Sequence, residues 1–289
     1  MRHLAFLLFA LTTAFRGQAQ SDPAKTFHFD ETYPVTKTTV LALQTEADKI
    51  TVTGSNRETV RIRIDRVVKS GGITLGGKEP FDVLVRQSTD EISIVEKQPS
   101  PTVMFFGYYL SDHTVQLEVP KDMNLRIRAQ DGDYTFNHLT GNLVLEADDA
   151  TVTLSDCAEG SKELQLGDGR LDIDGGGGSL RLMGGDLNVG IRKSAFAALD
   201  IKLDDGRLKA ETSLRDLGNY RIRGNYLPVE FTVTGGGGEF KIHHEGTVKA
   251  DPWYQPQEQM NHYAVFIGAS GNARIEIAVG DGNVHLRHW

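Results

Sequence analysis

Aspartate pairs are the residues of this sequence whose types and spacing could support catalysis. Two close pairs stand out: Asp148 with Asp149, and Asp172 with Asp174. Hydrolysis of a glycosidic bond needs two carboxyl groups about 5–10 Å apart, and in a repetitive fold these acids could stack near Asp168 and Asp205. Each of them lies in or beside a turn, however, where a carboxylate bonds to local backbone amides. We therefore expect these acids to hold turns, and we expect no catalytic residue.

Metal-binding motifs give a similar result. A solenoid that holds calcium uses the pattern Gly-Gly-x-Gly-x-Asp, and the glycine runs 175–178 and 235–238 do not continue in that way. Four histidines gather near the end of the chain: His243, His244, His285 and His288. Adjacent residues of a strand point to opposite faces, so the first two cannot simply share one ion. The sequence has neither HExxH nor paired CxxC, and we expect no metal site and no cofactor.

Two aromatic clusters are the better candidates for contact with a partner. The first comprises Phe105, Phe106, Tyr108 and Tyr109, and the second comprises Trp253 and Tyr254, with Tyr263 in the same excursion. Aromatic faces stack on sugar rings or anchor a protein partner. The alternative is that both segments fold back and cap the array, because large rings bury about 150–250 Å² each. Of the two interpretations, the sequence favours capping.

The elements that position these residues follow from a repeat. Asp-Gly occurs at Asp131-Gly132, Asp168-Gly169, Asp205-Gly206 and Asp281-Gly282. The first three recur every 37 residues, and Asp148-Asp149 and Gly185-Asp186 divide the two intervals roughly in half. The underlying period is therefore about 18 residues, within the range of a repeat architecture.

Apolar residues alternate on both sides of these turns, as strands with one buried face require. Two all-β folds explain the pattern. Each Asp-Gly could form a two-residue hairpin loop, which gives stacked antiparallel hairpins. Alternatively, each could form a corner of a β-solenoid resembling a β-helix, whose successive turns stack in register. Even spacing favours the solenoid, because hairpins in a meander need no constant length.

The repeat also divides the chain. We expect a signal peptide at 1–19, an irregular N-terminal β region at 20–115, and a repetitive solenoid region at 116–289 with an excursion at about 246–266. The N-terminal region has alternating strands without the short period. Terminal repeats of such arrays are usually atypical, because they cover an otherwise open edge.

Export is expected from the N-terminus. Arg2 and His3 precede an apolar run at 4–14, and small residues at Gly17 and Ala19 follow at a cleavage spacing. The run is too short for a transmembrane helix, which needs about 20 apolar residues, and no later segment qualifies. Cys157 is the single cysteine and cannot form an internal disulfide, so we expect it to be a buried filler. The expected location is the periplasm or the cell surface.

Charge excludes one class of partner. The chain has 31 Lys and Arg against 39 Asp and Glu, a net charge of −8. Nucleic-acid binding depends on clustered basic residues, so we expect no nucleic-acid partner.

A family resemblance adds to this picture. The stretch 35–62, ending ADKITVTGSNRETVRI, resembles the opening of the bacterial putative adhesin family, a secreted domain of unknown function. So does QLEVPKDMNLRIRAQDGDYTF from Gln116, and Gly141-Asn142-Leu143 resembles the Gly-Asp corners of that family. The resemblance covers the chain from about Val35 onward and implies an exported β-solenoid without known catalysis. It transfers no catalytic residues.

The expected function is therefore a non-catalytic, adhesin-like scaffold that binds an unknown protein or glycan at the cell envelope. Two alternatives stay open. One is a carbohydrate-active solenoid enzyme, which converging carboxylates in a groove would favour. The other is an accessory component of envelope-stress signalling.

Overall fold

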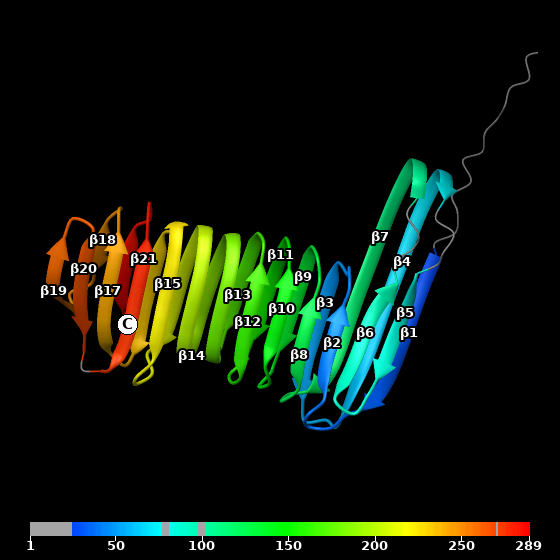
Figure 1. Ribbon diagram of the computed structural model, residues 1–289, viewed down its shortest axis with the longest axis horizontal. Coiled ribbons are helices and arrows are strands. Elements are labelled where there is room, and N and C mark those ends of the chain that lie inside the picture. The colour runs from blue at the N-terminus through cyan, green and yellow to red at the C-terminus, as the bar shows by residue number, and fades with distance from the viewer. Residues whose placement is uncertain (1–24, 77–80, 98–101, 270) are drawn as a thin grey trace, which may run out of the picture.

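The chain coils into one elongated, all-β array (Figure 1). The computed structural model describes residues 25–76, 81–97, 102–269 and 271–289. In the repetitive part, each turn of the coil contributes two strands, and we call such a turn a rung. The strands follow two pairing series along the length of the array, and a corner joins the series within every rung.

The first series begins at the N-terminal end of the array with an antiparallel pair. In spatial order it contains β5 (Asp82–Gln87), β6 (Glu91–Lys97), β2 (Val40–Gln44), β8 (Asn124–Arg128), β10 (Leu143–Ala147), β12 (Ser161–Leu166), segments of β14 (Gly177–Ser213), β15 (Asn219–Tyr226), β21 (Ala273–Val279), β17 (Gly238–His244), β20 (Tyr263–Gly268) and β19 (Tyr254–Met260).

The second series runs alongside the first. In spatial order it contains β1 (Lys25–Pro34), β4 (Thr59–Gly76), β7 (Thr102–Pro120), β3 (Lys49–Ser55), β9 (Gly132–Asn137), β11 (Ala150–Ser155), β13 (Gly169–Asp174), further segments of β14, β16 (Val229–Gly235), β22 (Val284–His288) and β18 (Val248–Ala250).

Parallel pairing between rungs decides between the two folds expected from the sequence. Ala150 pairs with Gly132 in the preceding rung and with Gly169 in the following one, and both pairings are parallel. A hairpin at each Asp-Gly would instead pair the two flanking strands antiparallel. The β-solenoid is confirmed, and the alternative of stacked hairpins is wrong for these rungs.

The core is a set of inward columns, one residue per rung. Leu125, Leu143 and Leu180 lie in one column, and each is at most 2% exposed. Ile127, Leu145, Leu164 and Leu182 form the next column and are fully buried. The alternation of apolar residues thus gives the strands their buried face.

Glycine at the corners is required by the stacking of rungs. Gly206 has φ +115°, and a Cβ there would fall on the backbone carbonyl oxygen of Leu187 in the preceding rung. Gly169 has φ +121° and would meet the carbonyl of Ala150 in the same way. These corners therefore need glycine for both conformation and close approach.

Replacing Gly206 with alanine should destabilise the array by about 2–4 kcal/mol, because the change combines a strained φ with a backbone clash. Gly190 in β14 is the matched control, since a Cβ there would meet only the Asp172 side chain, at 2.9 Å, and that side chain can turn away. Gly190→Ala should cost about 1 kcal/mol or less. Denaturant unfolding of both variants tests this, and equal losses would contradict it.

The rungs at both ends are out of chain order. The rung made by β2 and β3 lies between β6–β7 and β8–β9, although it precedes all of them in sequence. At the other end, the rung of β21 and β22 lies between β15–β16 and β17–β18. The change expected at 115/116 does not interrupt the sheet, because β7 runs through it. The excursion expected at 246–266 contains β18, β19 and the start of β20.

Candidate functional site

The corner aspartates hold neighbouring rungs together. Asp131 accepts a hydrogen bond from the backbone N–H of Asp149 at 3.3 Å, and Asp168 accepts one from Asp186 at 2.9 Å. Asn142 does the same for Ser161 at 2.8 Å, at the opposite corner. Each side chain binds the rung that follows its own, rather than the local backbone amides expected from the sequence.

The second acid pair lies elsewhere. Asp172 is on the strand β13, where Arg170 donates two hydrogen bonds to its carboxylate, at 2.5 and 3.2 Å. Asp174 is 3.5 Å from the Lys193 ammonium. The acids considered as a catalytic pair do not lie together. Asp168 is at a corner, whereas Asp172 and Asp174 are on β13 and are paired with basic side chains.

The remaining Asp-Gly residues also lie at corners. Asp205 in β14 pairs with Tyr226 in β15, and a Cβ on Gly282 would fall on the carbonyl oxygen of Leu227. A Cβ on Gly132 would lie 2.6 Å from the carbonyl oxygen of Asp48. The chain thus brings corners from successive rungs onto one edge of the array.

The first aromatic cluster lies in β7. The strand pairs antiparallel with β4 as far as Gly76 and Thr102, and the two strands extend beyond their neighbours (Figure 1). Phe105 is opposite Thr74, Phe106 opposite Ile73, Tyr108 opposite Gly71 and Tyr109 opposite Ser70. The side chains of these four aromatic residues lie outside the described part of the chain.

The second aromatic cluster joins the core at the C-terminal end of the array. Tyr254 is 3% exposed, its ring meets Phe240 edge-on at 5.1 Å, and its hydroxyl donates a hydrogen bond to the Arg287 carbonyl at 2.7 Å. Trp253 is half-buried and stacks on His288 with ring centroids 4.1 Å apart. The Tyr254 ring is therefore inaccessible to a partner, while one part of Trp253 stays exposed.

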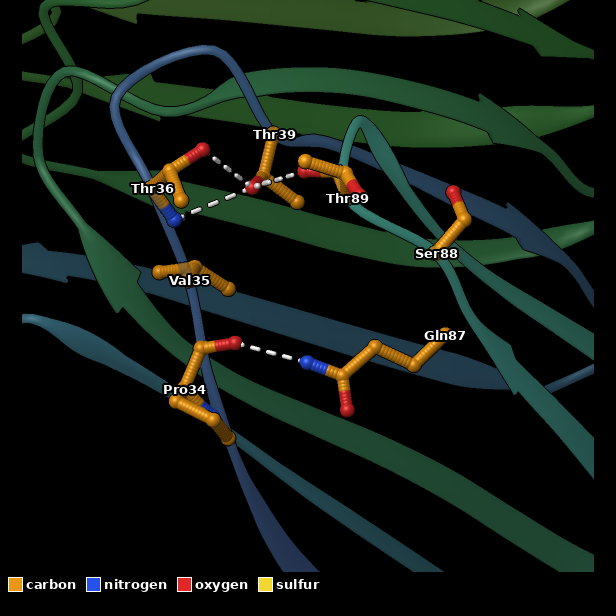
Figure 2. Close-up of a pocket in the computed structure, with 7 residues that line it drawn as sticks. All are labelled: Pro34, Val35, Thr36, Thr39, Gln87, Ser88 and Thr89. Atoms are coloured by element: carbon orange, nitrogen blue, oxygen red, sulfur yellow. Dashed lines mark hydrogen bonds between the residues drawn. The ribbon is translucent and has the colours of Figure 1, made fainter.

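A small hydroxyl-lined cavity of about 210 Å³ lies where β1 ends and β5 ends (Figure 2). The polar groups that line this cavity form hydrogen bonds mainly with one another. Thr39 Oγ1 accepts the Thr36 N–H at 3.0 Å and lies 3.3 Å from the Thr89 carbonyl, to which it donates. The Gln87 amide donates to the Pro34 carbonyl at 2.8 Å. This arrangement fixes the loop and leaves few groups for a ligand.

A larger cavity of about 440 Å³ lies near the opposite end, lined by His243, His244, Glu245, His262 and residues 278–280. His243 is exposed and His244 is 9% exposed, in keeping with their opposite faces. His262 was not among the residues expected from the sequence. It reaches the cavity because β17 and β20 pair antiparallel, and nothing in the local sequence marks that pairing.

The other two histidines considered from the sequence lie on β22. His285 pairs with Glu230 and Lys249 on the neighbouring strands, and His288 stacks on Trp253. Across the described ranges, no three His, Cys, Asp or Glu side chains come together as a metal site. No helix in the same ranges has the length and hydropathy to cross a bilayer.

One inward column contains a lysine. Lys162 occupies the position between Leu143 and Leu180 and is 3% exposed. Its ammonium donates hydrogen bonds to the carbonyls of Gly177, at 2.9 Å, and of Glu159. Burial disfavours the charged form and lowers the pKa of Lys162 to about 8.

This lysine predicts a pH dependence of stability. Between about pH 8 and its ordinary pKa of 10.5, the unfolded chain holds a proton that the folded chain has lost. The free energy of unfolding should therefore rise with pH in that window relative to a Lys162→Met variant. Denaturant unfolding of both chains between pH 7 and 11 tests this, and parallel profiles would contradict it.

Cys157 lies beside this column and is 1% exposed. Its thiol is 3.7 Å from the Phe136 carbonyl, and burial raises its pKa. A buried thiol of raised pKa is a poor nucleophile, in line with the filler role expected from the sequence.

A buried ionic cluster lies at the N-terminal end of the array. His113 on β7 is 3% exposed, the Glu96 side chain on β6 is fully buried, and His113 Nε2 lies 2.9 Å from Glu96 Oε1 without the alignment of a hydrogen bond. The other Glu96 oxygen accepts the Thr45 hydroxyl at 2.7 Å. Phe81 covers the cluster, with its ring 5.2 Å from the His113 ring and 4.5 Å from the Arg66 guanidinium. No pattern in the sequence predicts this group.

Comparison with known proteins identifies a family. The family model described as Toastrack DUF4097 matches residues 38–287. No curated protein matches the chain.

Three solved structures are similar over most of the chain. A putative adhesin from Bacteroides fragilis is 8% identical and one from Parabacteroides distasonis 10% identical, each with a TM-score of 0.37 over 90% of this chain and 97% of that chain. A putative cell adhesion protein from Clostridium sporogenes is 11% identical, with a TM-score of 0.27 over 91% of this chain and all of that one. Scores below 0.5 transfer neither a fold nor a function.

Proposed function

The chain belongs to the Toastrack DUF4097 family, and on this basis we propose that it is an exported, non-catalytic, adhesin-like scaffold that binds a protein or glycan at the cell envelope. Export is supported by the sequence of residues 1–19, with its short apolar run and small residues before Gln20. The periplasm or the cell surface is the proposed location.

The contacts of the aspartate carboxylates are the main support for the non-catalytic proposal. Asp131 and Asp168 each accept a backbone N–H of the following rung, and Asp172 is paired with Arg170. A general acid or nucleophile must present its carboxyl group to a substrate. These acids instead bind the backbone or a guanidinium, which favours a scaffold over the alternative of a carbohydrate-active enzyme.

The continuity of the array supports a scaffold. Every inward column from β2 to β22 belongs to one hydrophobic core, and side chains at the corners add bonds between rungs. Such an array keeps groups on its surface at fixed spacings over a long distance. This suits the display of a binding surface.

Export is tested by expressing the full chain in a bacterial host and fractionating the cells. We expect the protein outside the cytoplasm, with an intact mass that begins at Gln20. A variant with Leu7 and Leu8 both changed to Arg should stay in the cytoplasm at full length, because a charged run cannot serve as the apolar signal segment. Cytoplasmic full-length wild type would contradict the proposal.

Binding is tested with the purified mature chain on a glycan array and in pull-downs from envelope fractions, alongside a reducing-sugar release assay on the same glycans. We expect saturable binding to at least one envelope component and no release of sugar. Sugar release that Asp168→Asn or Asp172→Asn abolishes would overturn the non-catalytic proposal and favour the enzyme.

A further inference from the structure

Two histidines face each other across the strands at the C-terminal end of the array. His243 on β17 pairs with Tyr263 on β20, so the next residues, His244 and His262, are directly opposed. The backbone confirms this, because the His244 N–H donates to the His262 carbonyl at 3.1 Å. His262 lies in the turn before β20, one residue beyond the last paired residues of β17 and β20. Both residues line the 440 Å³ cavity.

The backbone also fixes the tautomer of both rings. His244 Nδ1 is 2.8 Å from the Gly246 carbonyl oxygen, and His262 Nδ1 is 3.2 Å from the His244 carbonyl oxygen. A carbonyl only accepts hydrogen bonds, so each Nδ1 carries the hydrogen. In the neutral ring the lone pair is then on Nε2. The side-chain hydrogen bonds of both residues, among the described part of the chain, are made through Nδ1.

This is the arrangement found in metal-binding imidazoles. A histidine ligand almost always donates its other ring N–H to a carbonyl or carboxylate, which orients the ring and raises its basicity. His244 is nine-tenths buried and already held in that state, so little ordering of its ring remains to be done on binding. Both residues line the same cavity, and the contacts that hold each ring are made through Nδ1.

We propose that His244 and His262 bind one divalent late transition-metal ion, Cu²⁺ most tightly and Zn²⁺ less so, through their Nε2 atoms. Imidazole suits these ions, and their affinity for a given nitrogen site follows the order Zn²⁺ below Cu²⁺. Water completes the coordination, since the chain supplies two ligands. The ion joins β17 to the turn that precedes β20 and thereby fastens the terminal hairpin.

His243 provides the internal control. It adjoins His244 in sequence and lines the same cavity, but it is on the other face of β17 and its ring contacts Tyr263 at 4.8 Å. A strand cannot turn both neighbours toward one ion. Loss of His243 should therefore leave the proposed site intact.

The test is calorimetric titration of Cu²⁺ and Zn²⁺ into the mature chain, freed of any purification tag, with Mg²⁺ as a control. We expect one equivalent of Cu²⁺ and of Zn²⁺ to bind, and Mg²⁺ to give no heat. His262→Gln should weaken both at least tenfold, because one of two ligands is lost. His243→Gln and His285→Gln should stay within about twofold of wild type.

A spectroscopic readout separates the site from loose surface binding. Electron paramagnetic resonance of the one-to-one Cu²⁺ complex should show two coordinated nitrogens in wild type and one in His262→Gln, a substitution at an exposed position that the fold should tolerate. Absence of saturable binding up to about 1 mM metal, or binding that His262→Gln leaves unchanged, overturns the proposal. Neither result bears on the scaffold function, which does not depend on a metal.

Discussion

A Tyr254→Ala variant should unfold with a loss of about 3–5 kcal/mol. The ring is 3% exposed and packs on Phe240, and its hydroxyl binds the Arg287 carbonyl in the rung of β21 and β22. Truncation leaves a cavity in the core and leaves the Arg287 carbonyl without its hydrogen-bond donor. Both changes lower the free energy of unfolding.

Two controls separate these penalties. Tyr254→Phe keeps the packing and loses the hydrogen bond, so it should cost about 0.5–1.5 kcal/mol. Trp253→Ala removes a half-buried ring and should cost less than Tyr254→Ala. Denaturant unfolding gives all three values. If Tyr254→Ala kept wild-type stability but lost binding in the glycan array, the segment would be a contact site rather than a cap.

A His113→Leu variant should lose a similar amount, about 3–5 kcal/mol, for an electrostatic reason. Glu96 would keep the Thr45 hydroxyl and the Glu46 N–H but lose the imidazole 2.9 Å from its other oxygen. Removing one member of a buried pair leaves the other without its partner, which is more costly than removing both.

The double variant His113→Leu/Glu96→Leu distinguishes this reason from simple loss of packing. Replacing both members of a buried pair with apolar residues is often nearly neutral, so the double variant should be more stable than His113→Leu. Equilibrium unfolding of the two single variants and the double variant gives the coupling energy. Additive losses would show that the pair makes no specific contribution.

The sequence predicts the repetitive middle of the array well, because that part obeys local rules. Alternation places Leu143, Leu145 and Leu164 inside, and the period of about 18 residues places the Asp-Gly corners one above another. The same alternation places Lys162 inside, although a lysine seldom takes such a position unless its charge is satisfied. The two carbonyls that bind it come from the folded corner.

The ends could not be predicted, because there the partners of a strand are set by long-range packing. The parallel pairing of β17 with β21 skips the hairpin of β19 and β20, and no spacing in the sequence indicates it. The opposition of His244 and His262 and the contact of Glu96 with His113 have the same origin. Each joins residues from segments outside the regular period.

The placement of β21 and β22 between two other rungs has a mechanical consequence. A force on this segment would act on hydrogen bonds along both of its edges at once, to β15 and β17 and to β16 and β18. Pulled along the strand direction, those bonds would be loaded in shear rather than opened one after another. We therefore expect the rung of β21 and β22 to resist a force along its strands better than a rung paired on one side only.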